Sequence, residues 1–233
     1  MQSPSYQDRR QKLTRYFDST AAGAWSRLTS DAPVGRVRAT VRAGRDLMRA
    51  RLLSWLPIDM RGRRLLDAGC GTGALAIEAA RHGASVVAVD VSATLVKLAD
   101  GRTPAGLPGD IQYCVGDMLD PAHGEIDFVV AMDSMIHYDS EDIVRMLSIL
   151  AGRTRCSILF TVAPRTPALA VMHAVGRLIP YHEHRAPAIV PVSDQGLRRR
   201  ISEAPALREW SLTDCDKISS GFYKSQAYRL KRR

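Results

Sequence analysis

The chain has 233 residues, of which 45% are hydrophobic, and it carries a formal net charge of +9. This length predicts one globular domain with an appended segment, and the charge favours an acidic partner, whether nucleic acid, an anionic membrane surface or a carboxylate-bearing substrate. The longest weakly polar run, "TPALAVMHAVGRLIP", contains an arginine and is shorter than the ~20 apolar residues that span a bilayer, and the polar amino terminus lacks the apolar stretch of a secretory signal, so we expect a cytoplasmic protein.

The first 60 residues precede the first strand-like run and predict a helical extension. Between residues 37 and 55, apolar side chains fall on one face of a helix and arginines on another. Tyr16, Phe17 and Trp25 offer broad aromatic faces, either to stack on a flat ligand or to pack the extension against the rest of the chain. Under the first alternative residues 1–60 form a lid, and Tyr16 and Trp25 are candidates for substrate contact.

Five strand-like apolar runs follow, and helical stretches separate them. The runs are "RLLDAG", "SVVAVDV", "IQYCVGD", "IDFVVAMDS" and "CSILFTVA", and two closing strands are predicted around "LREWSLTDCDKI" and "GFYKSQAYRL". Because the first five are apolar at successive positions, they suit a parallel sheet covered on both faces. Residues 61–233 are therefore predicted to form an α/β domain with a Rossmann-like, doubly wound, mostly parallel seven-stranded sheet. A proline-rich insertion at about residues 164–206 interrupts it after the fifth strand.

The stretch "LLDAGCGTGALAIEAARHGASVVAVD" holds a glycine loop between two predicted strands. Gly69, Gly71 and Ala74 satisfy the dinucleotide pattern, and Asp90 follows at the spacing of a ribose-binding acid. Asp67 discriminates between ligands, because a carboxylate at the end of the first strand repels a pyrophosphate. It attracts a ligand that brings a positive amino group and a sulfonium, by about 4 kcal/mol at 4 Å and an effective dielectric of 20. The loop therefore favours S-adenosylmethionine.

Each strand end has a predicted role in holding that cofactor. Asp90 would accept the two ribose hydroxyls, Asp117 the exocyclic amine of adenine, and Met118 would pack on the adenine face. Gly73 would let the following helix approach closely. The alternative, that the acids are solvated loop carboxylates, is less favoured because three of them follow three successive strands. The candidate cofactor-binding residues are Asp67, Gly69, Cys70, Gly71, Gly73, Asp90, Val91, Asp117, Met118 and Met132.

With these motifs in place, the chain resembles the class I S-adenosylmethionine-dependent methyltransferases over residues 60 to 233. The stretches "YFDSTAAGAWSRL", "GDMLDPAHGEIDFVVAMDSMIHY" and "GFYKSQ" further resemble the magnesium-protoporphyrin IX O-methyltransferases of purple photosynthetic bacteria. This resemblance implies methylation of one propionate carboxylate of magnesium protoporphyrin IX in bacteriochlorophyll biosynthesis, with magnesium present only as part of the substrate. It also implies two further partners, the porphyrin-binding subunit of magnesium chelatase and, peripherally, the chromatophore membrane surface.

The resemblance transfers to single residues only in part. Cyanobacterial and plant relatives carry a tyrosine in an "IYG" motif where this chain has Leu28-Thr29-Ser30, so no role of that tyrosine is carried over. Their "IHY" motif matches Ile136-His137-Tyr138, which makes His137 the catalytic candidate and Tyr138 a substrate-binding candidate. Two alternatives for His137 stay open, a structural contact with a backbone carbonyl and axial ligation of the porphyrin magnesium.

Other functions are weighed against this interpretation. RNA base methylation is disfavoured because Asp133-Ser134-Met135-Ile136 replaces the Asn/Asp-Pro-Pro-Tyr type of motif at the exit of the fourth strand, so we expect no nucleic-acid partner. A quinone precursor fits the core pattern equally well and is the alternative substrate. The four cysteines are spaced too widely for a zinc site, and His182 and His184 do not share a helical face, so we expect no metal held by the chain itself.

Overall fold

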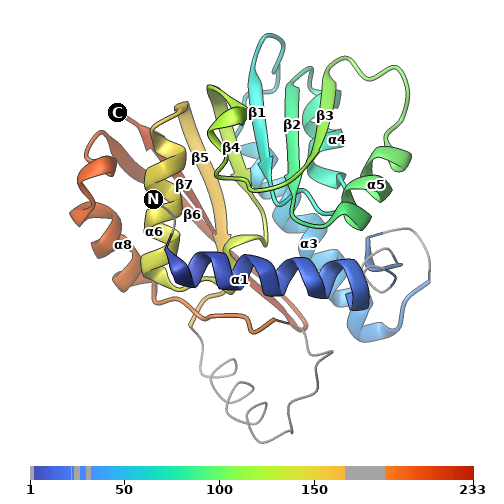
Figure 1. The fold of residues 1–233 in the computed structure, drawn as a ribbon, viewed down its shortest axis with the longest axis horizontal. Helices are drawn as coiled ribbons and strands as arrows, with labels where there is room; N and C mark the ends of the chain where they lie inside the picture. Colours follow the sequence, from blue (N-terminus) through green and yellow to red (C-terminus); the bar gives the residue numbers. More distant parts are fainter. Residues whose placement is uncertain (1–2, 22, 24–26, 30–32, 166–186) are drawn as a thin grey trace, which may run out of the picture.

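The computed structural model describes residues 3–21, 23, 27–29, 33–165 and 187–233. Its centre is a seven-stranded sheet in the order β3-β2-β1-β4-β5-β7-β6 (Figure 1). The strands are β1 (Arg64–Ala68), β2 (Ser85–Asp90), β3 (Asp110–Val115), β4 (Ile126–Ala131), β5 (Thr154–Val162), β6 (Trp210–Ser220) and β7 (Tyr223–Arg232). Strands β1 to β5 pair in parallel, whereas β7 runs antiparallel to both β5 and β6. The predicted seven-stranded, mostly parallel sheet is confirmed.

Successive strand residues divide between two hydrophobic clusters. In β1, Leu65 belongs to one cluster and Leu66 to the other, and Phe128 and Val129 of β4 divide in the same way. Since neighbouring side chains of a strand point to opposite faces, the clusters cover the two faces of the sheet. The helices α3 (Arg36–Ser54) and α4 (Ala74–Arg81) contribute to one cluster, and α6 (Ser140–Ala151) and α8 (Asp194–Glu203) to the other.

The strand order reverses between β1 and β4, so the connections after these two strands leave in opposite directions. Such a switch point opens a crevice at the carboxyl ends of the strands, where α/β proteins bind ligands. The helices that begin near this crevice are capped at their amino termini by polar side chains. Ser92 caps α5 (Ala93–Arg102) by accepting from the Leu95 N–H, and Asp139 caps α6 by accepting from the N–H groups of Glu141 and Asp142. Short 3₁₀ turns complete the fold at η2 (Pro121–His123), η3 (Met135–His137) and η4 (Pro205–Leu207).

The amino-terminal segment lies across this crevice. It begins with α1 (Pro4–Arg15), which continues into the π-helical turn η1 (Tyr16–Ala21) (Figure 1). Tyr6 and Leu13 of α1 are buried in the same cluster as α6 and α8. Asp18 of η1 accepts from the Ser92 hydroxyl at 2.6 Å, which joins this segment to the start of α5. Helix α1 and the turn η1 therefore pack on the sheet domain.

Helix α3 connects the extension to the far edge of the sheet. Met48 and Leu52 are fully buried, whereas Val37 in its first turn is exposed, so the predicted apolar face is buried only along the later turns. Arg51 pairs with Asp216 of β6 at 2.6 Å. The predicted division at residue 60 stays a prediction.

The later part of the predicted insertion, residues 187–206, packs against the core of the domain. Val192 bridges Pro164, and Leu197 and Ile201 of α8 are buried against α6. His182 and His184 lie outside the described residues. Over the described ranges, no helix has the length and apolar character needed to cross a membrane, and no three His, Cys, Asp or Glu side chains gather as a metal site.

Candidate active site

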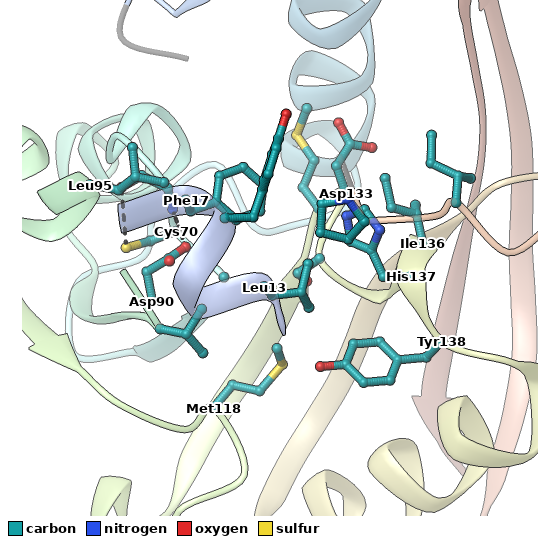
Figure 2. Close-up of a pocket in the computed structure, with 18 of the residues that line it drawn as sticks. Leu13, Phe17, Cys70, Asp90, Leu95, Met118, Asp133, Ile136, His137 and Tyr138 are labelled. Atoms are coloured by element: carbon teal, nitrogen blue, oxygen red, sulfur yellow. Dashed lines mark hydrogen bonds between the residues drawn. The ribbon is translucent and has the colours of Figure 1, made fainter. Parts of the chain in front are cut away.

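A cavity of about 400 Å³ occupies the crevice at the carboxyl ends of the parallel strands. Figure 2 shows Cys70 and Asp90 at one end, His137 and Tyr138 at the other, and Leu13 of α1 between them. A second cavity of about 200 Å³ lies beside it and shares Gly69, Cys70, Arg45 and Met132 with it. The larger volume lies within the range of small-molecule sites.

The glycine loop forms the wall between the two cavities. Gly69 and Gly71 both have positive φ, at 87° and 53°, in the left-handed region that favours glycine. A Cβ on Gly69 would lie 2.4 Å from the Cβ of Ser134, so the loop also approaches the exit of β4 too closely for a side chain. Gly73 faces the other way, where a Cβ would meet Tyr113 at 2.6 Å. The residues that this Cβ would meet belong to β3 and α5, so the role predicted for Gly73, close approach of the following helix, stays a prediction.

Asp90 lines the cavity with its carboxylate held by the backbone. Its Oδ2 accepts from the Gly71 N–H and its Oδ1 from the Ser92 N–H, both at 2.9 Å. Burial raises the pKa of this carboxyl, although these backbone hydrogen bonds oppose the shift. Each oxygen keeps a second lone pair, so the carboxylate can accept two further donors, such as the vicinal hydroxyls of a ribose. Val91 lines the cavity next to it.

Asp67 lies at the end of β1 and lines the smaller cavity. Its side chain is almost fully buried, at 2% exposure, and within the described part of the chain its Oδ2 has no hydrogen-bond partner. Burial, followed by the charge of Asp90, raises the pKa of Asp67 to about 7. The backbone at Ala76 forms a hydrogen bond with the carboxylate, but a buried oxygen without a partner is costly, and a ligand carrying a positive amino group or sulfonium would relieve this cost. The residues present therefore fit S-adenosylmethionine.

Asp117 makes contacts that the sequence pattern did not indicate. Its Oδ1 accepts from the Tyr6 hydroxyl at 2.6 Å, and its Oδ2 pairs with Arg10 at 2.5 Å. Both partners belong to α1, so Asp117 fastens the amino-terminal helix over the cavity. Met118, the next residue, lines the cavity, and its contact with adenine stays a prediction. The predicted bond from Asp117 to adenine stays a prediction.

His137 lies in η3 and lines the end of the cavity opposite Asp90 (Figure 2). It is 9% exposed, and burial lowers its pKa. Its Nδ1 lies 3.2 Å from the carbonyl oxygen of Ala188. Because a carbonyl only accepts, Nδ1 carries the proton in this pair, and the neutral ring keeps Nε2 as an acceptor.

The remaining substrate candidates come from separate elements. Tyr138 is buried and stacks on Tyr6 of α1, with ring centroids 5.2 Å apart. Tyr16 lines the cavity from η1. Trp25 lies outside the described residues.

Asp133 had no predicted role, and Arg45 was predicted only as one of a stripe of arginines, yet the two lie together in the cavity lining. Asp133 follows β4 with a φ of 56°. Its carboxylate accepts from Arg45 of α3 at 2.7 Å, from the Tyr223 hydroxyl at 3.0 Å and from Thr161 at 3.3 Å. Arg45 lines both cavities. The signal available in the sequence was an acid directly after the fourth strand, although its partners come from distant elements.

A cavity acid with two open acceptor positions, Asp90, and a second buried acid with one oxygen lacking a partner, Asp67, suit a cationic nucleoside better than a dinucleotide. The sheet also ends in an antiparallel strand, β7, paired with β5 and β6. These features define the class of the protein as a class I S-adenosylmethionine-dependent methyltransferase. In agreement, residues 65–155 match the sequence model of a methyltransferase domain, and residues 131–232 match that of the magnesium-protoporphyrin IX methyltransferase C-terminus.

Relatives define the family. The chain is 46% identical over 222 residues to the magnesium-protoporphyrin O-methyltransferase of Rhodobacter capsulatus, covering 95% of this chain and 96% of the relative. The chain therefore belongs to the magnesium-protoporphyrin O-methyltransferase family. The crystal structure of magnesium protoporphyrin IX methyltransferase from Synechocystis PCC 6803 with bound SAH superposes with a TM-score of 0.81 at 25% identity, over 97% of this chain and all of that one. A ubiquinone biosynthesis O-methyltransferase from Xanthomonas oryzae is 32% identical over 72% of this chain and 71% of its own, which is a weaker match.

Proposed function

We propose that this protein transfers a methyl group from S-adenosylmethionine to one propionate carboxylate of magnesium protoporphyrin IX, giving the monomethyl ester and S-adenosylhomocysteine. The observation that carries this function is the near full-length identity to the Rhodobacter capsulatus enzyme. The cavity supports it, because one continuous space joins Asp90 to His137.

The residues divide into cofactor and acceptor groups. Asp90 holds the ribose, the loop at Gly69 and Gly71 admits the cofactor against the backbone, and Asp67 faces its positive charge. The cofactor supplies a sulfonium-bound methyl group, which passes to a propionate oxygen as its bond to sulfur breaks. Holding an acceptor in line with such a group contributes ~7 to 11 kcal/mol by the effective-molarity argument. Positioning is therefore the main contribution of the protein.

His137 keeps the acceptor ionised. A carboxyl group entering an apolar cavity is harder to ionise, because burial disfavours its charged form. The neutral imidazole, with Nδ1–H on the Ala188 carbonyl, offers Nε2 to take the proton from a propionic acid. The competing roles, a purely structural bond to Ala188 and axial ligation of magnesium, predict different responses to substitution.

The helix α1 and the turn η1 act as a lid in this proposal. Leu13, Tyr16 and Phe17 line the cavity, while Tyr6 and Arg10 hold Asp117 at its rim. Closing the site excludes water from the reacting carboxylate.

An assay with several acceptors tests the function. Purified protein is given labelled S-adenosylmethionine with magnesium protoporphyrin IX, metal-free protoporphyrin, a quinol precursor or RNA. We expect label in the magnesium porphyrin fraction. Label in the quinol fraction alone would identify the alternative substrate.

Two partners belong to the same proposal. The porphyrin-binding subunit of magnesium chelatase would deliver the poorly soluble macrocycle by direct contact, and the net charge of +9 supports a peripheral contact with an anionic chromatophore surface. Co-purification with the chelatase subunit and flotation with anionic vesicles test the two contacts separately. Absence of either association would remove that partner without affecting the methyl transfer.

A further inference from the structure

The turn between β6 and β7 presents an exposed aromatic ring at the cavity mouth. Five large apolar side chains are exposed among the described residues, and Phe222, at 66% exposure, is the one that also lines the larger cavity. The turn is fixed rather than loose. The Ser220 hydroxyl donates to the Thr40 carbonyl of α3 at 2.9 Å, and a Cβ on Gly221 would meet the Thr40 side chain at 2.2 Å. Phe222 is therefore held at the rim without being buried.

The size of the cavity indicates what this ring meets. Pockets of ~300–1,000 Å³ each hold one drug-sized ligand, and this cavity of about 400 Å³ has to hold the cofactor and the reacting carboxylate. A tetrapyrrole macrocycle is too large to enter as well. Its flat face must therefore lie at the mouth, where apolar side chains from two other segments join Phe222 in lining the cavity, Val41 of α3 and both Pro187 and Ile189 of the stretch before α8.

The cationic side chains that line the cavity differ in whether their bonding partner is an acid or a neutral group. Three cationic side chains line the cavity among the described residues, namely Arg10, Arg45 and Lys224. Arg10 pairs with Asp117 and Arg45 with Asp133, whereas the Lys224 ammonium bonds to the neutral hydroxyl of Ser219. Lys224 thus keeps its charge available for an anion, two residues after Phe222 on the same hairpin.

From this juxtaposition we propose that the β6–β7 hairpin forms the binding surface for the porphyrin macrocycle. Phe222 stacks on the macrocycle, and Lys224 pairs with the second propionate, the one that is not methylated. The inference rests on the proposed function and extends it to substrate orientation. With one propionate bound at Lys224, the other carboxylate is the one that reaches His137, so the hairpin orients the macrocycle for methyl transfer.

The Phe222 part is tested by porphyrin binding, measured as a change in porphyrin fluorescence, and by steady-state kinetics. Phe222→Ala should weaken magnesium protoporphyrin IX binding about tenfold, as expected for losing one buried aromatic contact, and raise the KM for porphyrin while leaving the KM for S-adenosylmethionine unchanged. Phe222→Trp should restore binding. Ile58→Ala, which removes another exposed apolar side chain, is the matched control and should have no effect.

The Lys224 part is tested with two ligands that share the macrocycle, magnesium protoporphyrin IX with two charged propionates and its uncharged dimethyl ester. Lys224→Met should weaken binding of the diacid about fivefold, the scale of a partly exposed ion pair, and leave binding of the diester unchanged. Lys231→Met, at the far exposed end of β7, should change neither. Equal losses for both ligands would overturn the charge-pairing role.

These outcomes separate the hairpin from the proposed function. Failure of the unaltered protein to bind or methylate the porphyrin would overturn the function itself. Full methylation by the unaltered protein, with unchanged porphyrin affinity in Phe222→Ala and Lys224→Met, would overturn only the proposal that the hairpin binds the porphyrin. Should Phe222→Ala lose binding to anionic vesicles while keeping its porphyrin affinity, the hairpin is a membrane contact and the proposal is wrong.

Discussion

Arg45 of α3 and Asp133 at the exit of β4 form a salt bridge of 2.7 Å, with side-chain exposures of only 19% and 7%. The bridge joins the amino-terminal extension to the carboxyl end of the parallel sheet, at the point where the two cavities meet. Tyr223 and Thr161 donate to the same carboxylate. One acidic side chain therefore fixes three elements around the site.

The first prediction concerns this bridge. Asp133→Asn keeps a residue type that tolerates positive φ but removes the charge opposite Arg45. We expect the free energy of unfolding to fall by about 1–3 kcal/mol, because a partly buried cation loses an anionic partner. Urea unfolding measures it. Glu209→Gln, which removes the acid of an exposed pair with Arg232, is the control and should change stability by less than about 0.5 kcal/mol. Equal losses of stability in the two variants would show that the buried bridge of Asp133 stabilises the fold no more than an exposed ion pair does.

The second prediction concerns cofactor binding. Asp90→Ala removes a carboxylate that lines the cavity and is held by two backbone N–H groups. Loss of a charge-assisted pair of hydrogen bonds, worth about 1.5–3 kcal/mol, should weaken S-adenosylmethionine at least about tenfold by calorimetry. Asp110→Ala, on an exposed residue at the start of β3, should bind as the unaltered protein does. Unchanged affinity in Asp90→Ala would reopen the dinucleotide interpretation.

These residues show how far local sequence pattern reaches. The glycine loop, the seven strands and Asp90 follow from patterns within a few residues, so the fold and the presence of Asp90 in the cavity could be predicted. The bridge from Arg45 to Asp133 joins positions 88 apart in sequence, and Asp117 is fastened by Tyr6, 111 positions away. Contacts of this kind depend on the path that α1 and α3 take across the sheet, and no periodicity encodes that path.

Asp67 supports a prediction about pH. Its folded pKa of about 7 exceeds the ordinary 3.8, so its contribution to stability is present at low pH and is lost as pH rises through about 7. Asp67→Asn should therefore raise the Tm of the cofactor-free protein at pH 8, with a smaller gain at pH 5. The same substitution should reduce the Tm increase that S-adenosylmethionine produces, since the buried acid no longer attracts a cation. If Asp67→Asn gains stability and S-adenosylmethionine still raises its Tm by the full amount, the positive charge of the cofactor does not lie near Asp67.

His137 gives a prediction with two readouts. His137→Phe should lower turnover about 100-fold or more while leaving cofactor affinity within a few-fold. Burial holds the pKa of His137 below its ordinary 6.5, so the ring is neutral near pH 7 and protonates only as pH falls. Turnover of the unaltered protein should decline on this acid side, and His137→Gln should lose that decline along with most of its activity. Full activity in His137→Phe would favour the structural role, and lost porphyrin binding with retained turnover would favour axial ligation.

The last prediction concerns the lid. Tyr6→Phe with Arg10→Met removes both α1 donors to Asp117 but keeps the buried ring of Tyr6 in the core. If α1 acts as a lid, this double variant should fold, bind S-adenosylhomocysteine and methylate the porphyrin at a reduced rate, because water reaches the acceptor more often. Lys12→Met, on an exposed residue of the same helix, should retain the full rate. Deleting residues 1 to 30 should abolish porphyrin methylation and leave a domain that still binds the cofactor. A truncated protein that methylates at the full rate would exclude the lid, and one that cannot fold would show that Tyr6 and Leu13 serve mainly as core residues.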